Sequence, residues 1–313
     1  MRTSRARLAL AGLSTLAVVA VGATPQLLGS HVGTAFERLE DARPEWLWTS
    51  GLLVVVALAA WAQAWRSVIR SCGGEVGRAD AVARYAIGSA VNTFAPARLG
   101  DVVRIALFSR TLDHPERAWT SAGAYTTIGA VRTLVVAVLL VAGYAAGALP
   151  LWPLLGTLVC VGAAVVVAVL ARRRNPHTRV AHFFDAYREL GRVPLQAAPL
   201  LGWMVLSTAA RVGAVAAIGS SLGVHGSLGA AMLIVPAIDA ASLLPLTPGN
   251  IGVASGAVVV ALHGYGIGAD TALTISLGLH AVEAVVAVLC GTVGLLAVVG
   301  RRPPEAERAV ALP

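Results

Sequence analysis

The chain has 313 residues, of which 57% are hydrophobic and 13% are charged, and its mean hydropathy is +0.76. A soluble globular domain carries about 25% charged residues, so this composition predicts an integral membrane protein. The formal net charge is +8 at pH 7, and all 24 residues in the Lys+Arg count are arginine. The absence of lysine excludes a Schiff-base lysine and a phosphate-binding P-loop. The arginines cluster beside apolar stretches, which favours membrane topology signals over nucleic-acid binding.

A helix needs roughly 20 mostly apolar residues to cross a bilayer. The stretches that meet this length are 8–29, 46–69, 127–149, 152–171, 197–222 and 270–299. Two further regions, 80–110 and 227–265, are interrupted by proline, glycine and polar residues. We therefore predict an all-α, polytopic integral membrane helix bundle with about six full spans plus two re-entrant hairpins. Residues 1–300 would form this single domain, and residues 301–313 a disordered cytoplasmic tail.

Charged residues at the ends of these spans predict their orientation. Arginine-rich segments lie at 1–7, 66–84, 172–192 and 301–313. Segment 30–45 is instead net acidic. The positive-inside rule places the arginine-rich segments in the cytoplasm and 30–45 outside, so both termini of this multi-pass protein of the cytoplasmic membrane would be cytoplasmic. Two alternatives stay open: the interrupted regions could cross in pairs, and residues 1–23 could be a cleaved signal peptide.

The first interruption runs from Asn92 to Arg104 and contains Pro96. Irregular backbone at membrane depth survives only inside protein or beside a water-filled cavity. Arg98, Asp101 and Arg104 recur every three residues and would share one helix face. Because the planar guanidinium donates two parallel hydrogen bonds, this pattern favours binding of a phosphate, here a phospholipid headgroup. The alternative is a solvated amphipathic helix that obeys the positive-inside rule.

The second interruption contains no charge at its centre. Its candidate residues are Pro248, Gly249, Asn250, Gly252 and Ser255. The glycines permit close backbone approach. Paired interruptions in two halves of a transporter indicate a binding site, so we expect both breaks to contribute to one. The alternative is a helix-turn-helix at the membrane surface.

Several ionisable residues lie alone in apolar stretches. Arg211, Asp239 and Glu283 are the candidates for a cavity, with His280 one turn before Glu283. A charge at the bilayer centre costs roughly 3 kcal/mol or more, so such residues usually face a cavity or a partner. A purely structural Arg211–Asp239 or Arg211–Glu283 pair is the alternative. Arg132 lies near a predicted span end, and we expect its side chain to extend to the membrane surface.

No pattern in the sequence indicates a metal site, a cofactor or a catalytic centre. The cysteines, Cys72, Cys160 and Cys290, are scattered and lack metal-ligand spacing. The histidines show no metal-binding pattern, and no nucleophile–base pair is evident. We therefore expect no cofactor, no metal and no enzymatic activity.

Two motifs carry a resemblance to a known family. The first is Pro96, Arg98, Gly100, Asp101 and Arg104, and the second is the set of five residues given for the second interruption. In order and spacing they resemble P-x-R-x-G-E-x-x-R and P-G-G-x-G-x-x-E of the flippase-like membrane domain of lysylphosphatidylglycerol synthases and its stand-alone relatives. Three positions depart from the family's pattern. Asp101 replaces Glu conservatively, and Ser255 stands where the family usually has Glu. The family also often has an acidic residue just before the arginine of its third span, whereas here Val131 precedes Arg132.

The resemblance implies a lipid flippase or transporter that moves an anionic phospholipid or lipid-linked substrate. The soluble aminoacyl-transfer domain of bifunctional members is missing from the sequence, so lysyl transfer from tRNA is not expected. Two alternatives remain, an intramembrane lipid headgroup transferase and a non-catalytic membrane partner of a glycosyltransferase. The partners expected are membrane lipids and the lipid substrate, with no nucleic acid, and a homo-oligomer or a membrane enzyme partner is possible.

Overall fold

The computed structural model describes residues 42–95, 98–145, 151, 155, 162, 194–224, 226–241, 251–263 and 265–300. Within these residues all regular secondary structure is helical, which confirms the predicted all-α class. The predicted span 8–29, the possible signal peptide and the tail lie outside the described residues, and so does nearly all of the span 152–171.

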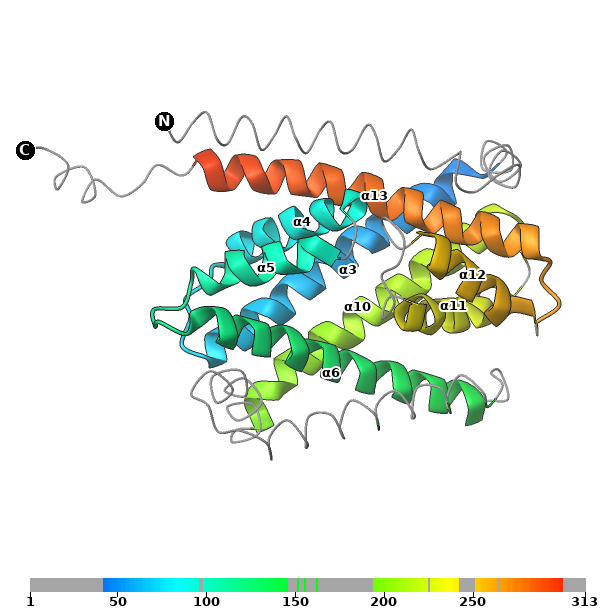
Figure 1. Ribbon diagram of the computed structural model, residues 1–313. Helices are drawn as coiled ribbons and strands as arrows, with labels where there is room; N and C mark the ends of the chain where they lie inside the picture. Colours follow the sequence, from blue (N-terminus) through cyan, green and yellow to red (C-terminus); the bar gives the residue numbers. More distant parts are fainter. Residues whose placement is uncertain are drawn as a thin grey trace, which may run out of the picture.

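Long apolar helices occur at four of the predicted spans. They are α3 (Pro44–Ser71), α6 (Arg117–Ala145), α10 (Pro194–Ser221) and α13 (Ala269–Gly300). At 1.5 Å per residue, the 28 residues of α3 extend about 42 Å, more than the roughly 30 Å of a bilayer's hydrocarbon core. The four helices run along the length of the bundle (Figure 1). Their outward faces carry exposed apolar side chains such as Val138 and Val293, as expected for contact with lipid.

The helix α6 begins earlier than predicted, at Arg117 instead of residue 127. Its first turns contain Thr120 and Ser121, which are polar but buried. The Ser121 hydroxyl donates a hydrogen bond of 2.9 Å to the carbonyl oxygen of Ile105. Tertiary burial, and not apolar composition, therefore extends this helix, and it moves Arg132 away from the helix end.

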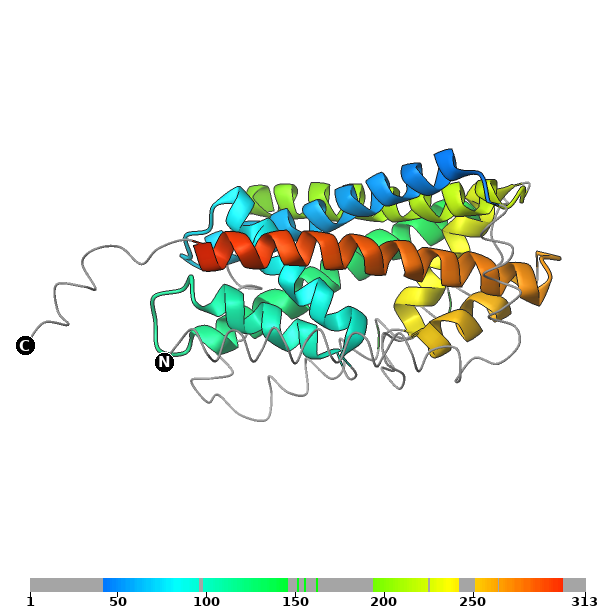
Figure 2. The same cartoon turned by 90° about the horizontal axis from the view of Figure 1, so that it is seen from above.

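Two pairs of shorter helices occupy the interrupted regions. They are α4 (Arg78–Phe94) with α5 (Leu99–Ser109), and α11 (Ser227–Ala241) with α12 (Ile251–His263). The members of each pair pack against one another. The two pairs lie toward opposite ends of the bundle, as both views show (Figures 1 and 2). Each of these helices has 17 residues or fewer, which is short for a full membrane span.

Small residues allow α4 to approach its neighbours closely. A Cβ atom on Gly100 of α5 would lie 2.0 Å from the carbonyl oxygen of Gly88 in α4, so glycine is required there. On the other side, a Cβ atom on Gly291 of α13 would lie 2.5 Å from the Cβ of Ala90. Close packing through small residues is characteristic of membrane helices, where the hydrophobic effect does not drive association. It holds α4 close to α13.

Candidate functional site

A cavity of about 320 Å³ lies within the bundle, walled by α3, α4, α5, α6, α10, α11 and α13. Apolar side chains such as Leu58 and Ala287 line part of it. The charged, amide, imidazole and phenol groups that line it are Tyr85, Asn92, Arg98, Asp101, Arg104, Tyr125, Arg132, Arg211, Asp239, His280 and Glu283. Among the residues that the structure describes, four guanidiniums face three carboxylates, which leaves one positive charge in excess when the histidine is neutral. The cavity therefore suits an anion.

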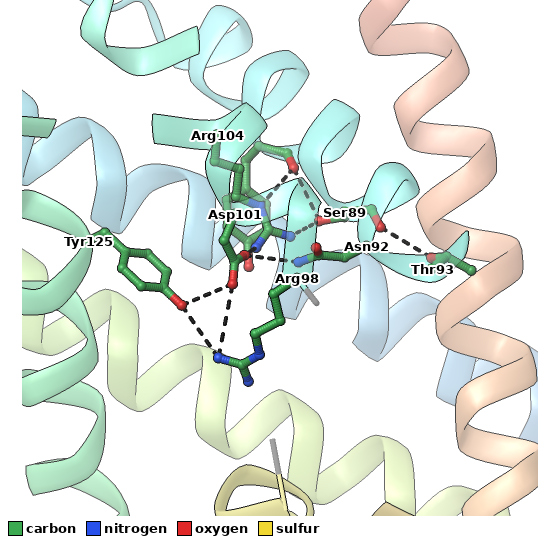
Figure 3. A network of polar contacts seen from close by, with 8 residues as sticks. Ser89, Asn92, Thr93, Arg98, Asp101, Arg104 and Tyr125 are labelled. Carbon is green, nitrogen blue, oxygen red and sulfur yellow. Dashed lines mark hydrogen bonds and ion pairs between the residues drawn. The ribbon is translucent and has the colours of Figure 1, made fainter. Parts of the chain in front are cut away.

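Asp101, near the start of α5, organises the first of two charged clusters (Figure 3). Its Oδ1 accepts a hydrogen bond of 2.9 Å from the Asn92 amide and another from Nη1 of Arg104. Its Oδ2 accepts a hydrogen bond of 2.9 Å from the Tyr125 hydroxyl and lies 4.0 Å from Nη1 of Arg98. These contacts join α4, α5 and α6 and hold the carboxylate in one position.

Arg104 is held by α4 as well as by Asp101. Its Nη2 donates to the Ser89 hydroxyl at 2.7 Å, and its Nε donates to the carbonyl oxygen of Tyr85 at 3.4 Å. The guanidinium carbon also lies 4.1 Å above the centre of the Tyr85 ring. With a side chain only 11% exposed, Arg104 is bound on most sides by the protein itself. These contacts indicate that Arg104 positions α5 on α4 and does not contact a ligand directly.

Arg98 differs from Arg104 in exposure and in backbone conformation. Its side chain is 36% exposed and extends beside Tyr125, as Figure 3 shows. Within the described part of the chain it makes one hydrogen bond, 3.4 Å long, from Nη1 to the Tyr125 hydroxyl. The residue is left-handed, with φ 56° and ψ 37°, immediately before α5. A left-handed non-glycine residue costs roughly 1–2 kcal/mol, so the surrounding structure has to hold Arg98 in place.

The second cluster joins four helices through ion pairs. Oδ1 of Asp239 in α11 accepts hydrogen bonds from Arg132 in α6 and from Arg211 in α10, the latter at 2.8 Å between Nη1 and Oδ1. Nη2 of Arg211 lies 3.4 Å from Oε1 of Glu283 in α13. The Arg211–Asp239 and Arg211–Glu283 pairs, which the sequence suggested as a structural alternative, are therefore both present. The residues of both pairs line the cavity.

The prediction that Arg132 extends to the membrane surface is wrong. Its guanidinium lines the cavity, pairs with Asp239 and lies 5.0 Å from the centre of the Trp61 ring. The reason is that α6 begins at Arg117, which places Arg132 in the interior of the helix. Its position in an apolar run, the same signal that selected Arg211, could have identified it.

Other cavity residues also escaped the sequence analysis. Tyr85 and Tyr125 hold the two arginines of the first break, and Trp61 lies under Arg132. His280 was noticed but not selected, and it lines the cavity. Its Nδ1 lies 2.7 Å from the carbonyl oxygen of Ser276 and must therefore carry the hydrogen that it donates. Aromatic residues in apolar helices carry no distinctive sequence signal, since most of them simply pack.

The predicted site residues divide into three groups. The cavity brings together Asn92, Arg98, Asp101, Arg104, Arg211, Asp239 and Glu283. Gly100 lies instead at the crossing of α4 and α5, Gly252 is exposed at the start of α12, and Ser255 is buried with its hydroxyl 3.0 Å from that of Ser276. None of these three lines the cavity. The remaining ones, Pro96, Pro248, Gly249 and Asn250, lie outside the described residues.

Comparisons with curated proteins and with solved structures find no match. The family model of the lysylphosphatidylglycerol synthase TM region matches residues 6–291, which is most of the chain. This agrees with the resemblance found in the two motifs and with the long apolar helices. The chain is a multi-pass membrane protein and belongs to the lysylphosphatidylglycerol synthase transmembrane-region family.

Proposed function

We propose that this protein is a lipid flippase or transporter that moves an anionic phospholipid or lipid-linked substrate across the cytoplasmic membrane. The observation that carries this proposal is the cavity, in which four guanidiniums of the described residues face three carboxylates inside a bundle of apolar helices. Charges inside a membrane protein are expensive and usually mark the pathway of a substrate or ion. A cavity of about 320 Å³ suits a headgroup, while the acyl chains stay among the exposed apolar faces of the bundle.

In this proposal the two helix pairs are re-entrant hairpins. The pair of α4 and α5 would enter from the cytoplasm, and the pair of α11 and α12 from outside, with both chain termini in the cytoplasm. Their positions toward opposite ends of the bundle support this arrangement. The cavity supports it too, because α4 and α5 of the first pair and α11 of the second pair line it. Alternating exposure of the cavity to the two sides would then move the headgroup.

Arg98 would make the first contact with the phosphate. It is the most exposed of the cavity arginines in the two ion-pair clusters, and its guanidinium retains donors beyond its hydrogen bond to Tyr125. Asp101 and Arg104 would position Arg98, because their hydrogen bonds fix the start of α5 on α4. The left-handed backbone of Arg98 supports this part, because strained conformations concentrate at binding sites.

A scrambling assay tests the proposal. The purified full chain is reconstituted into phosphatidylcholine vesicles that contain a trace of fluorescent phosphatidylglycerol, and a membrane-impermeant quencher is added. We expect the inner-leaflet label to become accessible faster than in protein-free vesicles. Labelled phosphatidylcholine serves as a cargo control. Because we propose transport without chemical change, mass spectrometry should recover the same lipid. Equal rates with and without protein would refute the proposal, and a modified headgroup would favour the transferase.

A further inference from the structure

The carboxylate of Asp239 is bonded unevenly. Its Oδ1 accepts hydrogen bonds from Arg132 and from Arg211, whereas its Oδ2 is buried and has no hydrogen-bond partner among the residues that the structure describes. Buried polar atoms are nearly always bonded, and a carboxylate can use both oxygens against a single guanidinium. Two cationic forks from two helices thus converge on one oxygen atom. The two guanidiniums therefore form an anion-binding site that Asp239 fills incompletely.

We propose that Asp239 is an internal counter-anion that occupies the position of the substrate's phosphate. An incoming phosphate group would displace Oδ1 of Asp239 from Arg132 and Arg211 and take over their hydrogen bonds. This inference rests on the proposed function and deepens it, because it assigns the second charged cluster a phosphate as its ligand. A phosphodiester has two unesterified oxygens, so it can serve both guanidiniums where Asp239 uses one atom.

The charges of the cavity support this exchange. Arg132, Arg211 and Asp239 line the same cavity as Arg98, so a phosphate held at Arg98 is already in the space that the second cluster faces. The described residues of the cavity carry one positive charge in excess, and one phosphodiester neutralises it. Glu283 also pairs with Arg211, but at 3.4 Å and with a side chain 31% exposed it is the weaker competitor.

The exchange couples binding to the position of α11. The ion pairs of Asp239 tie α11 to α6 and to α10. The helix ends at Ala241, two residues beyond Asp239, and the chain then enters the second break with Pro245 and Pro248. Releasing the carboxylate removes both ties at the end of the helix that adjoins the break. A ligand that binds better after this release shifts the protein toward the released state.

The substitution Asp239→Asn tests the competition, because it keeps the shape of the side chain and removes its charge. The purified full chain in neutral detergent is titrated with phosphatidylglycerol in one arm and with inorganic phosphate in the other. We expect the variant to bind at least one of them roughly ten-fold tighter than the wild type, since the internal competitor is gone. Tighter binding in both arms indicates recognition of the phosphate group alone. Tighter binding only of phosphatidylglycerol indicates a lipid headgroup.

The matched control is Asp80→Asn, which removes the carboxylate from another Asp–Arg pair, with Arg84 at 2.7 Å, outside the cavity. Its affinities should equal those of the wild type. Unchanged or weaker binding by Asp239→Asn in both arms would overturn the inference. If Asp239→Asn unfolds in neutral detergent, phosphatidylglycerol but not phosphatidylcholine should restore the folded protein, because the phosphate replaces the missing anion. Failure of that rescue would also overturn it.

These results separate the inference from the proposed function. A wild type that binds phosphatidylglycerol but does not scramble it refutes transport, while tighter binding by Asp239→Asn still supports the exchange. A wild type that scrambles phosphatidylglycerol, with an Asp239→Asn variant that binds no tighter, refutes the exchange alone. Absence of binding by both proteins in both arms refutes the exchange, whatever the scrambling assay shows.

Discussion

Arg211 and Asp239 are 28 positions apart in the sequence, and a hydrogen bond of 2.8 Å between Nη1 and Oδ1 joins them inside the cavity. The bond links α10 to α11, and Arg132 extends the link to α6 through the same oxygen atom. The network therefore connects long apolar helices to a helix beside the second break. The ion pairs in the cavity therefore also hold α6, α10 and α11 together.

Substitution Arg98→Lys should weaken phosphatidylglycerol binding roughly ten- to hundred-fold. Lysine keeps the charge but loses the planar fork, and the loss of one charge-assisted hydrogen bond costs about 1.5–3 kcal/mol. Lipid affinity and scrambling rate of the purified variant measure this effect. Arg110→Lys, at an exposed position just after α5, is the matched control and should behave as wild type. Wild-type affinity in Arg98→Lys would reduce Arg98 to a topology signal.

Substitution Gly100→Ala should destabilise the protein by roughly 1–3 kcal/mol, as overpacking does. The new Cβ would lie 2.0 Å from the carbonyl oxygen of Gly88 and would push α5 away from α4. The midpoint of thermal unfolding in detergent measures the change. Gly129→Ala in α6 is the control, because nothing lies within 4 Å of its added Cβ. Equal midpoints for the two variants would contradict the close crossing of α4 and α5.

Substitutions at Arg132 and Asp239 should be strongly coupled. Removal of one partner of a buried ion pair typically costs 3–5 kcal/mol, whereas removal of both leaves no uncompensated charge. The double variant Arg132→Gln with Asp239→Asn should therefore be less destabilised than the sum of the single variants. Chemical unfolding in a double-mutant cycle measures the coupling. Additive effects would contradict the ion pair between Arg132 and Asp239.

Cysteine labelling should place segment 30–45 outside the cell and segment 172–192 in the cytoplasm, because the second is rich in arginine and the first is net acidic. The variants Glu40→Cys and Val180→Cys are made in a background in which the three native cysteines are replaced. In intact cells, an impermeant thiol reagent should label the first variant and spare the second. The reverse pattern would invert the proposed orientation and the side from which each hairpin enters.

The sequence by itself determined the membrane class, the positions of four long apolar helices and the places where two further segments break. These features depend on composition and on residues close together along the chain, such as the three-residue spacing of Arg98, Asp101 and Arg104. The apolar surroundings of Arg211 and Asp239 also marked them in advance, because an unpaired charge is too costly in lipid.

Only the tertiary structure decided how these charges are shared. Most of the hydrogen-bond donors of Arg104 are used within the protein, whereas the side chain of Arg98 is more exposed. Arg132 points into the cavity, and Ser255 lies away from the cavity. The start of α6 was also decided there, since buried polar residues extend it. The physical reason is that an ion pair between helices depends on how far each helix extends and which face it turns inward. Packing across the whole bundle sets the length of each helix and the face that it turns inward. Local sequence patterns do not contain this information.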